Sequence, residues 1–287
     1  MLVWRALFYC AFTEKKGAAG VIGESSVQKI VADHITWQPK RGEAPVLKDI
    51  CLTLCAGEFY GILGPNGAGK TSLARQILKL QKSGEGSVRF DEMDIKQIKR
   101  DVLSRQISFL PQAFRADIEF TAYDVIAMGR EPHRKRFSRL SADDLCKIEE
   151  ALTATSCMGF RDKPISCLSG GERQRVMIAR TIAQDTPWIV LDEPVSNLDV
   201  KHQIKLMQAL KRLNGQGKTV AAILHDMNLA ASFCTKVILM RQGGVFAFGV
   251  PQEVLTKDNL MQVYGVEFAF LQCEGRKMPY IVPCGQC

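Results

Sequence analysis

Short, continuous apolar runs recur along the chain and define its expected architecture. They cover residues 59–63, 107–110, 188–191 and 219–224. Apolar runs of this length without polar alternation are typical of strands that are buried on both faces, as in a parallel sheet. After the first run, Leu73, Ile77 and Leu78 form one helical stripe. The pattern therefore predicts an α/β fold with a mostly parallel sheet.

Two further patterns add to this sheet. Residues 27–37 and 46–54 show alternating, β-prone positions on either side of a turn that contains Pro and Gly, which predicts an antiparallel β subdomain. Residues 121–155 follow a helical period instead, so we expect an inserted α-helical subdomain at about 113–170. Its expected apolar positions are Val125, Ile126, Met128, Leu145, Ile148 and Leu152.

One polar turn joins the first apolar run to its helix and holds Gly64, Pro65, Asn66, Gly67, Ala68, Gly69, Lys70, Thr71 and Ser72. Glycines lack a Cβ atom, so consecutive backbone N–H groups can curl around a phosphate, and the following helix aims its positive end at the same charge. Lys70 adds a cation for the β- and γ-phosphates, and Thr71 offers a hydroxyl to a magnesium ion. The turn predicts a P-loop that binds a nucleotide.

The composition is that of a globular protein with one principal domain. The chain has 287 residues, of which 46% are apolar and 24% are charged. No apolar run approaches the ~20 residues that are needed to span a bilayer. The net charge of +8 brings a polyanionic partner into consideration, either nucleic acid or an anionic lipid surface. The positive residues are scattered, however, and we interpret their one dense cluster, residues 130–139, as a solvated face.

The ten cysteines would indicate a disulfide scaffold only in a small secreted chain. Cys51 and Cys55 lie in an apolar run, so we expect small buried hydrophobic residues there. Cys284 and Cys287 have redox or metal spacing, but the second pair that a structural zinc site needs is missing.

Residues 1–26 are interpreted as an N-terminal extension that is disordered or precedes the native start. We expect no signal peptide in it, whereas an amphipathic anchor stays open.

Candidate catalytic residues follow the later apolar runs. Asp192 and Glu193 come directly after the third run. Side by side at a strand end, they point to different sides, so one can hold a magnesium shell while the other accepts a proton from an attacking water. His225 follows the fourth run and can contact a γ-phosphate. Gln112 follows the second run and can contact a metal or a water. Taken singly, each residue also fits an ordinary polar loop.

A second anion-binding helix start is predicted at Ser169, Gly170 and Gly171. Ser169 and Glu172 have capping-box spacing, so the glycines between them would expose the free N–H groups of the first turn. In isolation the motif is equally typical of a well-capped helix.

Trp37, on the first β-prone stretch, can stack on a base ring, although a lone Trp in a strand is more often a core residue.

Taken together, these motifs resemble the ATP-binding subunits of ABC transporters over residues 27–283. The matching parts, in chain order, are the Walker A loop (64–71), the Q-loop (Gln112), the signature (168–172), the Walker B strand (189–193), the D-loop (196–199, ending at Asp199) and the switch histidine (His225). The family also places a base-stacking aromatic residue where Trp37 lies. The leading 24 residues have no counterpart in the family, and residues 284–287 form a tail.

The resemblance implies an ATP hydrolase in which two copies sandwich two ATP molecules. Each ATP would be bound by the Walker motifs of one copy and by Ser169, Gly170 and Gly171 of the other, with Asp199 also in the nucleotide site.

Within each site, the resemblance assigns three roles to particular residues. Glu193 would be the general base and His225 would position the γ-phosphate. Mg²⁺ would be held by Thr71, Gln112 and Asp192.

The family also implies the partners of this chain. Integral membrane permease subunits would bind near Gln112, and a substrate-binding protein would deliver the cargo. The ATPase would be peripheral on the cytoplasmic face of the inner membrane. No nucleic-acid partner is expected.

A finer resemblance concerns the cargo. Residues 124–133 resemble the helical subdomain of importer ATPases that serve ferric siderophore, haem and cobalamin permeases, and residues 254–256 and 263–266 are similar to the same group. This implies that the residues from Met128 to His133 contact the permease. The alternatives are the ATPase of a transporter for another substrate, or of an exporter.

Two rival classes are disfavoured. An ATPase of chromosome maintenance would need long coiled coils between Lys70 and Leu168, and the chain is too short there. A ribosome-acting ABC protein would carry two cassettes.

Overall fold

A six-stranded sheet forms the centre of the computed structural model, which describes residues 28–40, 42–81, 84–112, 120–135, 138–275 and 278–284. The sheet has the order β10-β9-β3-β8-β7-β6. Its strands are β3 (Phe59–Leu63), β6 (Ile107–Leu110), β7 (Trp188–Asp192), β8 (Thr219–Ile223), β9 (Lys236–Arg241) and β10 (Gly244–Gly249). All neighbours are parallel except β9 and β10, so the predicted α/β fold with a mostly parallel sheet is confirmed.

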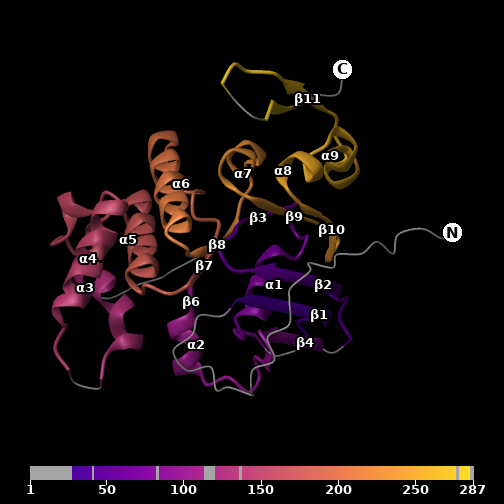
Figure 1. Ribbon diagram of the computed structural model, residues 1–287. Coiled ribbons are helices and arrows are strands. Elements are labelled where there is room, and N and C mark those ends of the chain that lie inside the picture. Colours follow the sequence, from indigo (N-terminus) through magenta and orange to yellow (C-terminus); the bar gives the residue numbers. More distant parts are fainter. Residues whose placement is uncertain are drawn as a thin grey trace.

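The predicted antiparallel β unit is a second, four-stranded sheet of order β2-β1-β4-β5. Its strands are β1 (Lys29–Trp37), β2 (Leu47–Cys55), β4 (Glu85–Phe90) and β5 (Met93–Asp94). All three pairings in it are antiparallel, as expected. A small two-stranded sheet of β11 (Phe268–Leu271) and β12 (Tyr280–Pro283) lies near the C-terminus (Figure 1).

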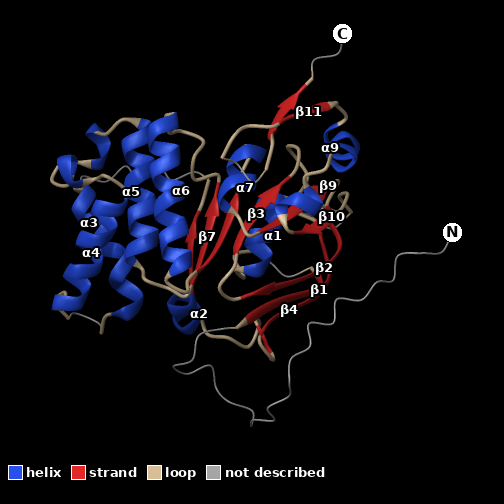
Figure 2. Cartoon of the chain, turned by 45° about the horizontal axis from the view of Figure 1, so that its top comes forward, coloured by secondary structure: helices blue, strands red, loops and turns tan. Residues whose placement is uncertain are grey.

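In Figures 1 and 2, α3, α4 and α5 form a helical group at one side of the sheets, and α6 lies next to this group. Beside the sheets lie α3 (Ala122–Ala127), η1 (Met128–His133), α4 (Ala142–Ala154), η2 (Met158–Phe160), η3 (Ile165–Cys167) and α5 (Gly170–Ala183). The others are α1 (Lys70–Ile77), α2 (Arg100–Gln106), α6 (Val200–Gly215), α7 (Met227–Phe233), α8 (Pro251–Val254) and α9 (Lys257–Tyr264). The residue limits of the domains stay a prediction.

The central strands are buried on both faces, as their apolar runs predict. Every residue of β3, β7 and β8 is buried. Successive side chains of a strand point to opposite faces, and β3 illustrates this. Tyr60 and Ile62 join a core with β1, β2, β4 and α1, whereas Phe59 and Leu63 join a core with α5, α6 and α7. The loops at the carboxyl ends of the strands are thereby held between two packed layers.

Burial on β2 contradicts one prediction. Cys51 and Cys55 are exposed rather than buried. The reason is that β2 has only one buried face, and the alternate positions Leu52 and Leu54 occupy it. No cysteine among the described residues is in a disulfide, while Cys287 and residues 1–26 lie outside the described part of the chain.

The helical part holds most of the expected core residues. Val125, Ile126, Ile148 and Leu152 are buried. Leu145, by contrast, is 44% exposed. The neighbouring position on the inner face of α4 belongs instead to Asp144, which is buried.

Candidate active site

The glycine loop between β3 and α1 has a shape that side chains would prevent. Gly64 has a φ of 146°, and a Cβ atom there would lie 2.3 Å from the carbonyl oxygen of Met240. Gly69 has a φ of 95°, and its Cβ atom would lie 2.9 Å from the carbonyl oxygen of Val46. Gly69 is also the N-cap of α1 and supplies no side-chain cap. The first N–H groups of α1 are therefore left for an anion.

Lys70 is buried, with 7% of its surface exposed. Its ammonium donates hydrogen bonds to the carbonyl oxygens of Gly64 at 2.8 Å and Pro65 at 3.0 Å. Burial lowers the pKa of Lys70, and the nearby carboxylates of Glu193 and Asp192 oppose this effect. The cation is thus tethered across the loop, where an incoming phosphate can replace the carbonyl groups as its partner.

Asp192 and Thr71 form a site that suits a divalent cation. The Thr71 hydroxyl donates to Oδ1 of Asp192 at 3.1 Å. Asp192 is fully buried, and its Oδ2 atom has no hydrogen-bond partner within the protein. Burial raises the pKa of the Asp192 carboxyl, while the hydrogen bond from Thr71 acts against it. An unpartnered buried carboxylate oxygen beside a threonine hydroxyl is the oxygen-rich environment that Mg²⁺ prefers.

Glu193 and His225 are in direct contact. The Nε2 atom of His225 lies 2.8 Å from Oε1 of Glu193, and the Glu193 side chain is 17% exposed. Glu193 has a φ of 52°, in the left-handed region that side chains rarely adopt. Such strain is common at functional positions because the surrounding fold must impose it. The Glu193 side chain lines a cavity together with the glycine loop.

Most of these groups line one cavity of about 480 Å³, whereas Gly64 and the buried Asp192 lie behind its lining. Its lining residues are Val46, Asn66, Gly67, Ala68, Gly69, Lys70, Thr71, Ser72, Gln112, Glu193 and His225. The structure therefore brings the glycine loop together with the three predicted residues that follow β6, β7 and β8. Gln112 reaches the cavity from the end of β6 and is exposed.

Val46 is a lining residue that the sequence analysis missed. Its N–H donates to the carbonyl oxygen of Trp37 at 2.8 Å, and its own carbonyl faces Gly69. No local signal marks a Val before a strand as a pocket residue. Trp37 itself is half-buried, packs against the core and does not line the cavity, so base stacking by Trp37 stays a prediction.

The signature residues lie outside this cavity. Ser169 caps α5, since its hydroxyl accepts from the Glu172 N–H at 3.3 Å and Glu172 accepts from the Ser169 N–H at 2.9 Å. Nothing lies within 4 Å of a Cβ atom placed on Gly170. Gly171 is half-buried and Asp199, which caps α6, is exposed. The helix start is thus open to an external ligand, and a single copy does not join it to the glycine loop.

The segment η1 corrects two predictions. Arg130 is only 4% exposed, so it does not belong to a solvated face. Gly129 is also buried, and a Cβ atom there would lie 2.4 Å from the carbonyl oxygen of Arg180. The predicted permease contact is therefore wrong for these two residues, because η1 packs directly on α5.

Arg130 holds the ends of two helices together. Its Nε donates to Asp144 Oδ1 at 2.7 Å at the start of α4, and its Nη1 donates to the carbonyl oxygen of Ala183 at 2.9 Å at the end of α5. Asp144 Oδ2 accepts from the N–H and hydroxyl of Ser141. Although burial acts to raise the pKa of Asp144, the hydrogen bonds from Ser141 and Arg130 outweigh it and hold the pKa at about 2. We call Arg130, Asp144, Ser141 and Ala183 the arginine clamp.

The α/β fold and the phosphate-binding pocket define this chain as a P-loop nucleotide hydrolase. The family model for ABC transporters matches residues 47–196. The chain belongs to the ABC transporter family and is an ATP-binding, ATP-hydrolysing cassette.

Curated relatives are similar over most of their length. The petrobactin import ATP-binding protein FpuC of Bacillus anthracis is 36% identical over 79% of this chain and 84% of its own. The ferric enterobactin transport ATP-binding protein FepC of Escherichia coli is 34% identical over 85% and 91%, respectively. The hemin import ATP-binding protein HmuV of Rhodococcus jostii is 38% identical over 78% and 76%.

A solved structure agrees with the fold. A bacterial ABC transporter cassette that was solved as a dimer is 32% identical, with a TM-score of 0.69 over 77% of this chain and 98% of the other. The same cassette is known in a post-hydrolysis state with bound ADP and phosphate. In the described part of this chain, we find no helix with the length and apolar character of a membrane span.

Proposed function

We propose that this chain hydrolyses ATP to drive the import of an iron chelate, haem or cobalamin through a separate permease. The observation that supports the cargo most directly is the agreement among relatives of 32–38% identity, whose names specify siderophore, hemin or cobalamin import. The expected class is therefore a bulky metal chelate rather than a sugar or an amino acid.

The working unit is two copies that enclose two ATP molecules. In each site, the glycine loop and Lys70 of one copy bind the phosphates. The exposed start of α5 in the other copy, with Ser169, Gly170 and Gly171, covers the γ-phosphate, and Asp199 lies at the same interface. Two findings support this arrangement: the open space at Gly170 and the dimer of the related cassette. Trp37 stacks on the adenine.

The bound cation is Mg²⁺, held by Thr71, Gln112 and Asp192. When bound, it neutralises phosphate charge. The donor atoms fit, because Asp192 Oδ2 is buried and unpartnered beside the Thr71 hydroxyl.

Hydrolysis begins when Glu193 accepts a proton from water as the water oxygen attacks the γ-phosphorus and the bond to the ADP oxygen breaks. In the empty protein the Nε2 atom of His225 lies 2.8 Å from Glu193, and with ATP bound the His225 N–H donates to a γ-phosphate oxygen instead. Closure around ATP and reopening after hydrolysis move the permease, whose contact lies near Gln112. The chain works at the cytoplasmic face of the membrane as a peripheral subunit, and a substrate-binding protein supplies the cargo.

The cargo is tested by uptake in a strain that lacks this chain, with labelled ferric siderophore, haem and cobalamin supplied separately. We expect uptake of at least one to be lost, restored by the wild-type chain and by Arg139→Ala at an exposed position, and not restored by Glu193→Gln. Unchanged uptake of all three ligands, together with loss of transport of a sugar or an amino acid, would overturn the proposed cargo class. The assignment of the chain as an ATPase would still hold.

A further inference from the structure

A cluster of metal-ligating side chains lies on the antiparallel sheet, away from the cavity at the glycine loop. It is built by an irregularity in the pairing of β1 with β2. Ala32 pairs with Leu52 and Ile35 pairs with Ile50, so two residues of β1 oppose a single residue of β2. The two are Asp33 and His34, and the one is Cys51. His34 has a φ of 51°, the left-handed conformation that an extra strand residue can adopt.

A second irregularity fixes the orientation of His34. Between the pairs Ile35–Ile50 and Trp37–Leu47, the extra residue belongs to β2, and Asp49 there has a φ of 50°. The Nδ1 atom of His34 lies 2.6 Å from Asp49 Oδ1. This contact occupies one ring nitrogen and leaves Nε2 for another partner. A carboxylate on the far nitrogen of a metal-binding His is the usual arrangement in metal sites, because it fixes the tautomer and the ring plane.

Strand β1, which carries Asp33 and His34, is also constrained by its other neighbour, β4. Gly86 of β4 has a φ of 82°, and a Cβ atom there would lie 2.4 Å from the carbonyl oxygens of both Asp33 and His34. The two ligands therefore lie on a central strand that is confined by both of its neighbours. Sites on such elements position their ligands more precisely than sites on loops.

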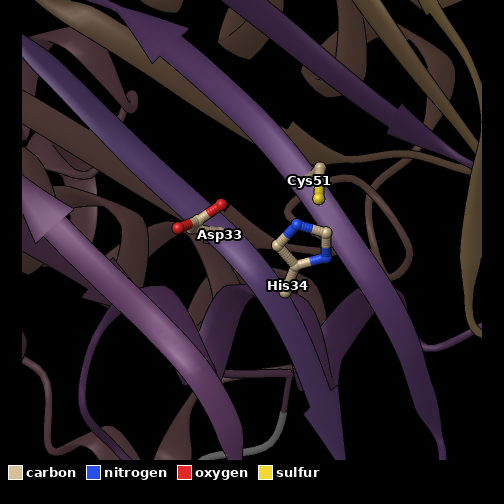
Figure 3. A group of neighbouring side chains, drawn as sticks. All are labelled: Asp33, His34 and Cys51. Atoms are coloured by element: carbon tan, nitrogen blue, oxygen red, sulfur yellow. The ribbon is translucent and has the colours of Figure 1, made fainter.

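The three side chains converge. One ligand atom of each of Asp33, His34 and Cys51 lies within 4.8 Å of the other two (Figure 3). In Figure 3 the His34 ring lies between the Asp33 carboxylate and the Cys51 sulfur, with one nitrogen directed toward the space that they share. Ligands around a tetrahedral zinc are separated by roughly 3.5 Å, given bonds of about 2.0–2.3 Å. His34 and Cys51 are exposed, so small rotations of their side chains can close the difference.

We propose that Asp33, His34 and Cys51 bind a zinc ion, with Asp49 as the carboxylate behind His34. One thiolate, one imidazole and one carboxylate make a mixed set that favours Zn²⁺ over Mg²⁺ or Ca²⁺, which prefer oxygen ligands alone. Three protein ligands leave the fourth position to water or to an external ligand. This site is separate from the Mg²⁺ site of the nucleotide pocket, and no part of it rests on the transport function.

The test measures zinc binding to the purified full chain, kept in a reductant without thiols and free of nucleotide. Titration against a competing zinc indicator gives the number and affinity of the sites. We expect Cys51→Ser and His34→Ala each to remove one equivalent of tightly bound zinc. Asp49→Asn keeps all three ligands, and we expect it to weaken the site on the order of 10–100-fold.

A matched control lies on the same strand. Cys55 is exposed on the same face of β2 as Cys51 but does not belong to the cluster, so Cys55→Ser should retain the site at wild-type affinity. Cobalt(II) provides a second readout, because a thiolate-to-cobalt absorption band should appear in the wild type and in Cys55→Ser and be absent in Cys51→Ser. Equal melting temperatures among the variants exclude loss of fold as the cause. Wild-type zinc binding and an unchanged cobalt spectrum in Cys51→Ser and His34→Ala would overturn the proposal.

Discussion

Two groups of buried charges in this molecule differ in how far their hydrogen bonds are satisfied. In the arginine clamp, Arg130 bonds Asp144 and the carbonyl of Ala183, and both oxygens of Asp144 have partners. In the nucleotide pocket, by contrast, Asp192 is fully buried with one oxygen unpartnered. Buried charges whose hydrogen bonds are all made hold helices together. A buried carboxylate with an unpartnered oxygen, in contrast, is available to a ligand.

Electrostatics show the same contrast. In the clamp, hydrogen bonds overcome burial and hold the pKa of Asp144 at about 2. In the pocket, burial prevails and raises the pKa of Asp192 while lowering that of Lys70. Each pocket charge is thus less favourable in the empty protein than in water. A ligand that carries phosphates and a divalent cation would relieve both.

Glu193→Gln should have the largest effect on activity. The amide keeps the shape of the side chain but cannot accept the proton, so we expect ATP hydrolysis to fall by about 10²–10⁴-fold. ATP should still bind and should trap two copies as a stable dimer, which size-exclusion chromatography with ATP will show. Hydrolysis near the wild-type rate would mean that another residue is the base.

Arg130→Ala should have the largest effect on stability. It leaves the buried Asp144 carboxylate without its cationic partner, and we expect the free energy of unfolding to fall by about 3–5 kcal/mol. Chemical denaturation measures this loss. Arg139→Ala, at an exposed position of the same basic stretch, serves as control and should stay within about 0.5 kcal/mol. Equal effects of the two variants would show that the clamp has no special role.

Gly129→Ala tests the close packing that the clamp depends on. The added methyl group would meet the carbonyl oxygen of Arg180 at 2.4 Å, so η1 must move away from α5. We expect a loss of about 1–3 kcal/mol. At Gly159 nothing lies within 4 Å of the added atom, and Gly159→Ala should be close to neutral. A neutral Gly129→Ala would mean that η1 is not constrained.

Acid should weaken the clamp in a defined range of pH. The folded pKa of Asp144, about 2, lies below its ordinary value of 3.8. A lowered pKa stabilises the folded state above the ordinary value, and this contribution, about 2 kcal/mol, is lost as the pH falls from about 4 to 2. Denaturation of the wild type and of Asp144→Asn across this range should show a steeper decline in the wild type. Parallel curves would exclude Asp144 as the source.

Local sequence was sufficient to predict the glycine loop, the buried strands and the residues that follow them. In each case one short pattern determines the structure, as with Gly64, whose φ of 146° excludes a side chain. Contacts between distant segments were not predictable in this way. The burial of Arg130 depends on where α4 begins and α5 ends, and Val46 enters the cavity only because its carbonyl faces Gly69.

The irregularities in the pairing of β1 with β2 could not be predicted from local sequence for a similar reason. Neither His34 nor Asp49 is a glycine, yet both adopt a positive φ because the pairing of the two strands requires it. Alternation alone places Cys51 on one face of β2, and its apolar neighbours in sequence wrongly favour the buried face. The face that a strand presents to its core is set by the elements that pack against it, here β3 and α1, and alternation along β2 does not reveal which face they cover.

Asp192→Asn tests most directly whether the unsatisfied charges are kept for Mg²⁺ and ATP. Because burial raises the pKa of Asp192, its charge destabilises the empty protein near neutral pH, so the variant should melt at or above the wild-type temperature without nucleotide. With ATP, the stabilisation by Mg²⁺ should be lost, and the affinity for the ion should fall on the order of 10–100-fold. A variant that melts well below the wild type and keeps its full response to Mg²⁺ would contradict the account.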